Sequence, residues 1–178
     1  MFDKIKARFT KHLIEREVQK QIRIKKAINL DSSKKIGILF NLNDEKVLTW
    51  VYDFINKLTD DGKIVRAICY LPEKKVPDYY LTKLKVDLIQ PHDLNFFGIP
   101  GSPRVKDFIK NEFDLLLDLS LKDEPSLDYL IVMSKAGFKV GRYRKSMIKV
   151  FDLMIRKKED MDFKDYYKSL LQYLSKIK

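Results

Sequence analysis

The sequence has few of the residues that most often carry metal or redox chemistry. Its 178 residues include one cysteine, Cys69, and two histidines, His12 and His92. A single cysteine cannot form a disulfide within the chain, and its apolar neighbours predict a buried, unreactive thiol. Two distant histidines and one cysteine do not have the spacing of a metal site. We therefore expect neither a metal nor a cofactor.

Glycine is also scarce where nucleotide-binding folds require it. The segment after the first predicted strand, residues 40–45, reads FNLNDE, with no glycine and two carboxylates. A dinucleotide fold carries G-x-G-x-x-G there so that its backbone can approach the pyrophosphate. The motifs G-x-x-x-x-G-K-[ST] and G-x-S-x-G are absent as well. His92 next to Asp93 reads as a loop residue, so we predict no catalytic residues and favour a protein that is not an enzyme.

Long apolar runs are missing too. No uncharged apolar run approaches the ~20 residues that a membrane-spanning helix needs. The first twenty residues are charged throughout and contain no apolar segment typical of a secretory signal. We therefore expect a cytoplasmic protein without an integral membrane segment.

Positive charge is abundant, and half of its excess lies in one segment. The chain has 36 basic and 25 acidic residues, a net charge of +11, and residues 1–30 hold nine basic but three acidic residues. The spacing of Phe2, Ile5 and Phe9 predicts an amphipathic helix. We divide the chain into this basic N-terminal helix, residues 1–30, and one domain, residues 31–178. The helix packs on the domain with its basic side exposed, binds RNA or an acidic protein, or lies on an anionic membrane; we prefer the first interpretation.

Short apolar runs alternate with helical periodicity along the rest of the chain. The runs predicted to form strands are residues 36–40, 64–70, 86–89, 113–119, 138–141 and 150–155. Alternating strands and helices indicate parallel strands joined by right-handed crossovers. The predicted fold is a three-layer, Rossmann-like α/β sandwich with a mostly parallel sheet of five or six strands.

A second basic segment, residues 135–149, contains six basic residues, no acid and one tyrosine between two arginines. Basic side chains with an interleaved aromatic suit a phosphate backbone with stackable bases. The alternative is a solvated face offset by acids folded nearby. The predicted nucleic-acid-binding residues are Lys135, Lys139, Arg142, Tyr143, Arg144, Lys145 and Lys149, together with Lys4, Arg8 and Lys11 of the N-terminal segment.

A loop rich in glycine and proline leads into a predicted short helix. Its helix N-terminus presents unpaired N–H groups, which favour a small anion. Polar residues at the end of the strand 113–119 lie at the sheet edge where ligands bind in such folds. The predicted anion-binding residues are Gly98, Gly101, Ser102, Arg104, Asp118 and Ser120. The alternative is an ordinary turn, with Asp118 as a helix cap.

Two resemblances follow from the chain after Lys34. The segments 113–120, 134–141 and 151–155 resemble a family of small proteins from Bacteroidota that carry a domain of unknown function. The shorter stretch 113–142 is similar to the N-terminal half of heptosyltransferase-type GT-B glycosyltransferases. The second resemblance implies a Rossmann-like fold, in enzymes that use another domain to hold a nucleotide sugar.

The leading functional hypothesis is a non-enzymatic cytoplasmic protein that docks on a polyanion, RNA or a ribonucleoprotein, through its basic segments. One alternative is a small enzyme, or an enzyme-derived binder, that holds a nucleotide or a sugar phosphate. Another is an interaction module that uses the N-terminal helix to join a protein partner.

Overall fold

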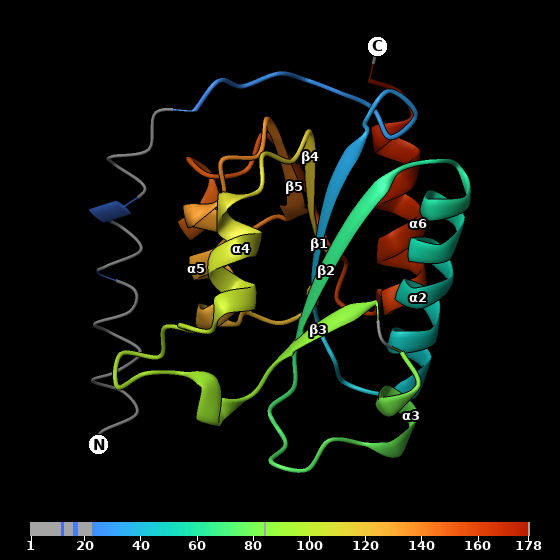
Figure 1. Cartoon of the computed structure of the whole chain (residues 1–178). Helices are drawn as coiled ribbons and strands as arrows, with labels where there is room; N and C mark the ends of the chain where they lie inside the picture. The colour runs from blue at the N-terminus through green and yellow to red at the C-terminus, as the bar shows by residue number, and fades with distance from the viewer. Residues whose placement is uncertain (1–11, 13–15, 18–22, 84, 178) are drawn as a thin grey trace.

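The computed structural model describes residues 12, 16–17, 23–83 and 85–177. Most of the predicted N-terminal helix, residues 1–30, lies outside these residues, as do Lys4, Arg8 and Lys11. The described chain is built around a central sheet with helices on both sides (Figure 1).

Six strands form this sheet within the described ranges, and every neighbouring pair is parallel. The strand order is β3-β2-β1-β4-β5-β6. The strands are β1 (Lys35–Asn41), β2 (Ile64–Tyr70), β3 (Val86–Ile89), β4 (Leu115–Asp118), β5 (Phe138–Arg142) and β6 (Leu153–Ile155). The predicted Rossmann-like α/β fold with a parallel sheet is confirmed.

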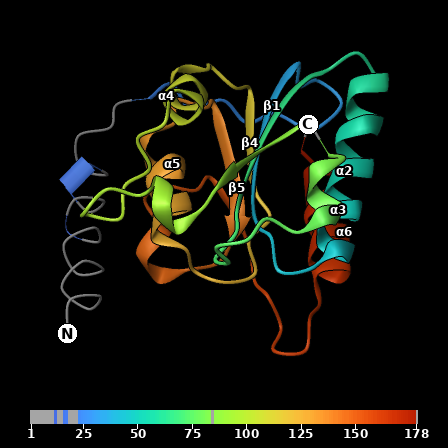
Figure 2. The same ribbon diagram turned by 60° about the horizontal axis from the view of Figure 1, so that its bottom comes forward.

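Helices cover the two faces of the sheet in separate layers (Figures 1 and 2). Helices α2 (Glu45–Asp60) and α6 (Phe163–Leu174) lie on one face, and α4 (Pro103–Lys110) and α5 (Pro125–Met133) lie on the other. The short helix α3 (Asp78–Leu81) contacts α2. Two 3-10 turns, η1 (Pro91–Asp93) and η2 (Lys145–Met147), interrupt the connections.

Local sequence sets the limits of these helices. The carboxylate of Asp44 accepts a hydrogen bond from the backbone N–H of Val47 and begins α2. Gly62, with a φ of 78°, follows the end of the same helix and adopts the left-handed conformation that glycine tolerates. Asp162 caps α6 in the same way as Asp44 caps α2, through the N–H of Asp165.

Both faces of the strands are buried, which explains their continuous apolar runs. Along β1, Ile38 and Phe40 pack in the cluster that contains α2 and α6. Leu39, between them, packs in the cluster that contains α4 and α5. All three side chains are fully buried. This alternation also shows to which face each polar residue on a strand points.

Residues 23–29, here called the strap, are not helical, so the prediction of a helix through residue 30 is wrong for this part. The strap crosses the end of the sheet where the strands begin, here called the amino edge (Figure 1). Its Arg23 side chain donates hydrogen bonds to the backbone oxygens of Ala136, Gly137 and Val150 and contacts the carboxylate of Asp152. These tertiary contacts, together with a backbone hydrogen bond from the N–H of Lys26 to the oxygen of Gly137, hold the strap against the amino edge.

The opposite end of the sheet, where the strands end, is here called the carboxyl edge. Neighbouring strands β1 and β4 diverge there, because β1 leads to α2 on one face and β4 leads to α5 on the other. Open α/β sheets commonly bind ligands at the carboxyl ends of two strands that diverge in this way.

Candidate functional site

Buried ion pairs occupy the carboxyl edge. Asp118 is the last residue of β4, and its Oδ2 accepts a hydrogen bond of 3.0 Å from Arg144. The same guanidinium donates to Asp128, in the first turn of α5, at 2.5 Å. Asp118 is 1% exposed and Arg144 is 7% exposed. One buried guanidinium therefore bonds to two carboxylates, of which Asp118 is buried and Asp128 is 18% exposed.

Burial and crowding change the protonation of this cluster. Burial raises the pKa of Asp128 to about 6, against the opposing effect of Arg144, and the nearby carboxylate of Asp118 raises it further. Burial alone would lower the pKa of Arg144, but Asp118 and Asp128 outweigh it, so the pKa is raised. Arg144 remains charged, and Asp128 takes up a proton in mildly acidic solution.

Two further contacts connect this cluster to its surroundings. Arg142, at the end of β5, donates to the carboxylate of Asp123. The hydroxyl of Tyr166 on α6 donates to the backbone oxygen of Asp118 at 3.0 Å. The carboxyl edge is therefore bonded to strands and to helices of both layers.

The predicted nucleic-acid-binding segment does not form one basic surface. Lys139 is fully buried, and its Nζ donates to the backbone oxygens of Ile131 and Val132. Burial lowers the pKa of Lys139 to about 7, and the charge of Arg23 adds to this effect. The inclusion of Lys139 and Arg144 in an exposed basic patch is therefore wrong, because both side chains have buried partners from other elements.

The remaining members of that segment point to different places. Lys135, before β5, is exposed at the amino edge. Tyr143 and Lys145 are exposed beyond the carboxyl end of β5, where the guanidinium of Arg156 lies 5.2 Å from the centre of the Tyr143 ring. Lys149 is exposed in the connection to β6. Lys135 is thus separated from Tyr143 and Lys145 by the length of β5.

The six residues of the predicted anion site also fall into two groups. Ser102 caps α4 through its Oγ, and Arg104 lies 3.8 Å from Asp87. Gly98 provides a turn with a φ of 71°, and Gly101 has no atom near the position of a Cβ. The other two members lie together at the carboxyl edge, where the N–H of Ser120 donates to Asp118. Asp118 is itself a carboxylate, and the positive charge of its partner Arg144 is already neutralised by Asp118 and Asp128, so this pair does not favour an anion.

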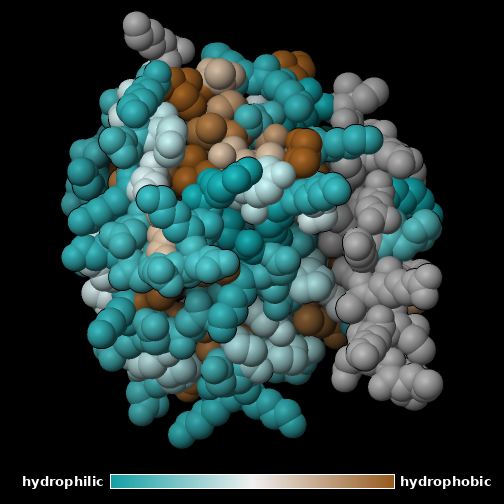
Figure 3. Space-filling view, turned by 180° about the vertical axis from the view of Figure 1, so that it is seen from behind, coloured by the Kyte–Doolittle hydropathy of each residue, from teal (hydrophilic) through white to brown (hydrophobic). Residues whose placement is uncertain are grey.

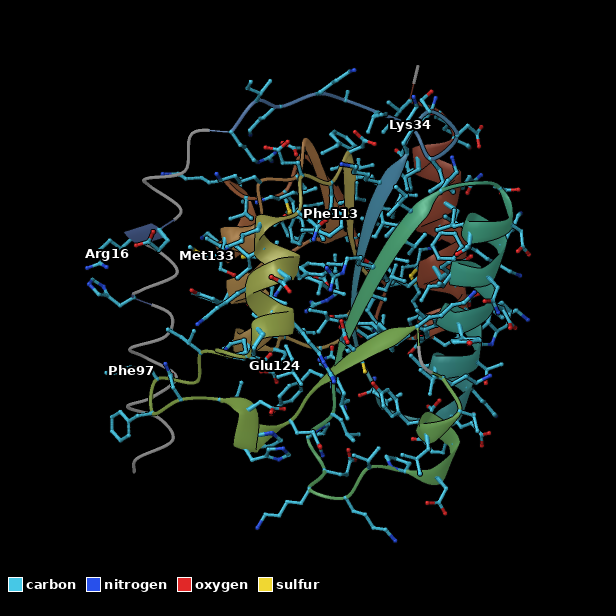
Figure 4. The ribbon with its side chains drawn as sticks, in the orientation of Figure 1. Arg16, Lys34, Phe97, Phe113, Glu124 and Met133 are labelled. Atoms are coloured by element: carbon cyan, nitrogen blue, oxygen red, sulfur yellow. The ribbon has the colours of Figure 1, made fainter. Side chains whose placement is uncertain are left out.

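The amino edge carries a groove with a volume of about 590 Å³. The strap, the start of β1 and the loops before β4 and β5 form its walls. Among the described residues its lining comprises Arg23, Ile24, Lys26, Ile28, Lys34, Lys35, Glu112, Phe113, Asp114, Lys135 and Gly137. Figure 4 shows Lys34 and Phe113 near this end of the sheet and Glu124 toward the opposite end.

Some charged side chains in this groove have bonding partners, and others have no ion-pair partner among the described residues. Arg23 is bound to Asp152, and the carboxylate of Asp114 accepts from the backbone N–H groups of Lys34 and Lys35. The four lysines that line the groove are exposed, and the described residues provide no ion-pair partner for any of them. These four are Lys26, Lys34, Lys35 and Lys135.

Hydrophobic residues accompany the charges at this end of the molecule. Ile24 is 90% exposed, and Ile28 lines the same groove. Seen from behind, hydrophobic residues gather near the top of the molecule among hydrophilic ones (Figure 3). The lysine stems and isoleucines therefore offer apolar contact beside the positive charges.

The cysteine and the two histidines were considered from the sequence for redox, catalytic or metal chemistry, and none of them belongs to the ion pairs described above at the two edges. Cys69 is buried in β2, and burial raises the pKa of its thiol. His92 is largely exposed, 3.7 Å from Asp93, and His12 is exposed. In the described part of the chain, no group of three or more His, Cys, Asp or Glu residues could hold a metal ion. No helix among the described residues is long and apolar enough to cross a membrane.

The fold and the polar carboxyl edge define the class of protein, a Rossmann-like α/β protein with an all-parallel sheet. Residues 6–177 match the model of the family of unknown function DUF6913, and the chain belongs to this family. No curated protein and no solved structure matches the chain significantly.

Proposed function

We propose that the protein is a non-enzymatic cytoplasmic protein that docks RNA, free or within a ribonucleoprotein, in the groove at its amino edge. The observation that supports this proposal is the lining of that groove, in which five basic residues outnumber two acidic ones among the described residues. The groove replaces the binding surface that residues 135–149 were expected to form. Among the described residues, Lys135 is the basic residue of that segment that lines the groove.

The proposed docking acts on the phosphate backbone. A protein that neutralises phosphates with lysines releases condensed counterions, and this release drives binding without sequence specificity. Phe113 is the aromatic residue in the groove lining, and it is buried, so it offers no ring for a base to stack on. We therefore expect the affinity for RNA to fall steeply as the salt concentration rises, and to differ little between base sequences.

The test is fluorescence anisotropy of a labelled single-stranded RNA over a series of salt concentrations. For single strands, log affinity falls with log salt with a slope of about −0.7 per neutralised phosphate. Changing Lys26, Lys34, Lys35 and Lys135 to Gln should therefore reduce the steepness of this slope by up to about 3 and weaken binding at every salt concentration.

A matched control changes four other exposed lysines, Lys46, Lys74, Lys75 and Lys122, to Gln. This variant has the same net charge as the groove variant but retains the groove. If both variants lose affinity equally, the effect belongs to net charge and the groove is not the docking site. Binding that is absent or independent of salt contradicts RNA docking altogether.

Two finer predictions from the sequence do not bear on this proposal. An origin in Bacteroidota and the similarity of residues 113–142 to glycosyltransferases stay predictions. RNA docking at the amino edge depends on neither of them.

A further inference from the structure

The groove at the amino edge is small compared with an RNA chain. Its volume of about 590 Å³ lies within the range of pockets that hold one small ligand. A cube of that volume has an edge of roughly 8 Å, close to the Debye length at physiological ionic strength. A charge inside the groove therefore interacts with the cations of its whole lining, whereas charges farther along an RNA are largely screened from them.

The segments that carry the four lysines of the groove are bonded to one another. Oδ2 of Asp114, in the loop before β4, accepts hydrogen bonds of 2.8 Å from the backbone N–H groups of Lys34 and Lys35. The N–H of Lys26, in the strap, donates to the backbone oxygen of Gly137, in the loop before β5. The N–H of Gly137 in turn donates to a backbone oxygen of the loop before β4. The strap, the start of β1 and both loops therefore form one bonded frame around the groove.

These bonds occupy backbone donors that could otherwise hold a phosphate. The N–H groups of Lys26, Lys34 and Lys35 donate to protein oxygens, so they are not available to a ligand. Sites that transfer phosphoryl groups from nucleoside triphosphates hold the phosphates with backbone N–H groups of a glycine-rich loop. In this groove an anion meets lysine ammonium groups, which act as point charges. The groove therefore favours a ligand by the number of charges it places in a small volume.

The charge of the lining exceeds what the interior of an RNA strand supplies. Five basic and two acidic residues line the groove among those described, a net charge of +3. At about 3.4 Å or more per phosphate, roughly two backbone phosphates lie within 8 Å, and each carries one charge. A 5′-triphosphate places about four negative charges in a similar length, because its terminal phosphate carries up to about two. A triphosphate therefore compensates the lining fully, whereas an internal stretch leaves positive charge over.

Apolar side chains beside the lysines suit the first nucleotide of such an RNA. Ile24 is 90% exposed in the strap, and both it and Ile28 line the groove. Aliphatic side chains contact any base and provide no donor or acceptor that distinguishes one base from another. We therefore expect affinity to depend on the phosphates of the first nucleotide and little on its base.

We propose that the groove binds the 5′-triphosphate end of an RNA in preference to the interior of the strand. The four lysines of the groove contact the phosphates, and the strap lies against the first nucleotide. An RNA has such an end when its first nucleotide retains the phosphates of the nucleoside triphosphate from which synthesis began. This inference rests on the proposed function, RNA docking at the amino edge, and adds which part of the RNA is bound.

The test is fluorescence anisotropy with one short single-stranded RNA, labelled at its 3′ end, that carries a 5′-triphosphate, a 5′-monophosphate or a 5′-hydroxyl group. The buffer contains physiological salt and no divalent cation, because a cation bound to the phosphates would compete with the lysines. The triphosphate RNA should bind at least about tenfold more tightly than the hydroxyl RNA, since each added charge forms a further surface ion pair. The monophosphate RNA should lie between them.

A charge-matched RNA separates local charge from total charge. The hydroxyl RNA lengthened by about four nucleotides has the total charge of the triphosphate RNA, but its added charges are spread along the strand. It should bind no more than about twofold more tightly than the shorter hydroxyl RNA. Inorganic triphosphate in excess should displace the triphosphate RNA, because it supplies the same concentrated charge without a nucleotide.

Protein variants then connect the preference to the groove. The variant with the four lysines of the groove changed to Gln should bind the triphosphate and hydroxyl RNAs equally weakly. The control with Lys46, Lys74, Lys75 and Lys122 changed to Gln has the same net charge and should retain the preference. Both variants change exposed lysines, so their Tm values should stay close to that of the wild type.

The outcomes that overturn this proposal differ from those that contradict RNA docking. Equal affinity for the triphosphate and hydroxyl RNAs overturns it, and so does equal affinity for the triphosphate RNA and the lengthened hydroxyl RNA. In both cases RNA docking stands if the groove variant still weakens binding of every RNA. A preference that persists in the groove variant, or a triphosphate RNA that inorganic triphosphate does not displace, also overturns it. Absence of binding to every RNA contradicts RNA docking and this proposal together.

Discussion

Basic side chains differ in burial and in ion pairing between the two edges of the sheet. At the carboxyl edge, Arg144 is buried and bonded to Asp118 and Asp128. At the amino edge, Lys34 and Lys135 are exposed beside a groove. Arg144 at the first edge is held by two carboxylates, whereas the lysines that line the groove at the second edge, unlike Arg23 beside them, have no ion-pair partner among the described residues.

This difference shows why charge counted along a sequence does not locate a binding surface. Residues 135–149 contain six basic residues and no acid, yet the structure supplies acidic partners from elsewhere to two of them, Arg142 and Arg144. Asp118 and Asp123 come from the end of β4 and the loop after it, and Asp128 comes from α5. A basic segment is available for binding when the fold brings it no acidic partner.

The largest expected effect follows from removing the central cation of the carboxyl edge. Arg144→Met leaves the buried carboxylate of Asp118 and the partly buried carboxylate of Asp128 without their guanidinium and should lower the free energy of unfolding by about 4 kcal/mol. Urea unfolding measures this change. The neighbouring variant Lys145→Met, at an exposed position, should change it by less than about 0.5 kcal/mol. Equal effects of the two variants would contradict the contrast between buried and exposed basic residues.

A smaller effect is expected for the arginine that holds the strap. Arg23→Ala removes donors to three backbone oxygens and the ion pair with Asp152, and should cost about 2–3 kcal/mol of unfolding free energy. It should also weaken RNA binding because the strap forms one wall of the groove. Lys25 contacts the same carboxylate at 3.3 Å but is 60% exposed, so Lys25→Ala should cost under about 1 kcal/mol. A wild-type stability in Arg23→Ala would show that the strap is not held by this side chain.

The next effect is a pH dependence that belongs to the carboxyl edge. Burial raises the pKa of Asp128 from 3.8 to about 6, so the folded state binds more protons than the unfolded state between these values. The free energy of unfolding should therefore fall as pH rises from about 4 to about 6. Asp128→Asn should remove about 2 kcal/mol of that fall, measured by urea unfolding across this range. Asp123→Asn, at an exposed side chain, should retain it, and a wild-type pH profile in Asp128→Asn would contradict the assignment.

The smallest effect tests the loop before α4. The Oγ of Ser102 accepts from the N–H of Val105, so Ser102→Ala should lower the free energy of unfolding by about 1 kcal/mol. Addition of inorganic phosphate should stabilise the wild type and this variant equally in thermal unfolding. Stabilisation of the wild type alone would instead support the anion site expected from the sequence.

The sequence was sufficient to predict the six strands of the sheet, because their signals are local, whereas the helix expected through residue 30 is wrong for the strap. The apolar run from Ile64 to Tyr70 is a strand, and Ser102 with Pro103 begins a helix as predicted. Buried parallel strands need continuous apolar runs, and helix ends need capping residues. Both features can therefore be recognised from residues that are adjacent in the sequence.

The strand order and the site could not be predicted in the same way. Arg144 meets Asp118 across 26 residues, and Arg23 meets Asp152 across 129. Asn41 follows the first apolar run and is buried, and its burial depends on which strand lies beside β1. Such pairings depend on the order of strands in the sheet, for which the sequence contains no local signal.

The bond between Arg23 and Asp152 also has a consequence for synthesis of the chain. At about 5–20 residues per second, a ribosome needs roughly 6–26 s to proceed from the first of these residues to the second. Until residue 137 has been added, the lysines of the strap are present on the growing chain without the loop before β5 that completes the groove. A polyanion that requires the whole groove would therefore discriminate between finished and nascent molecules.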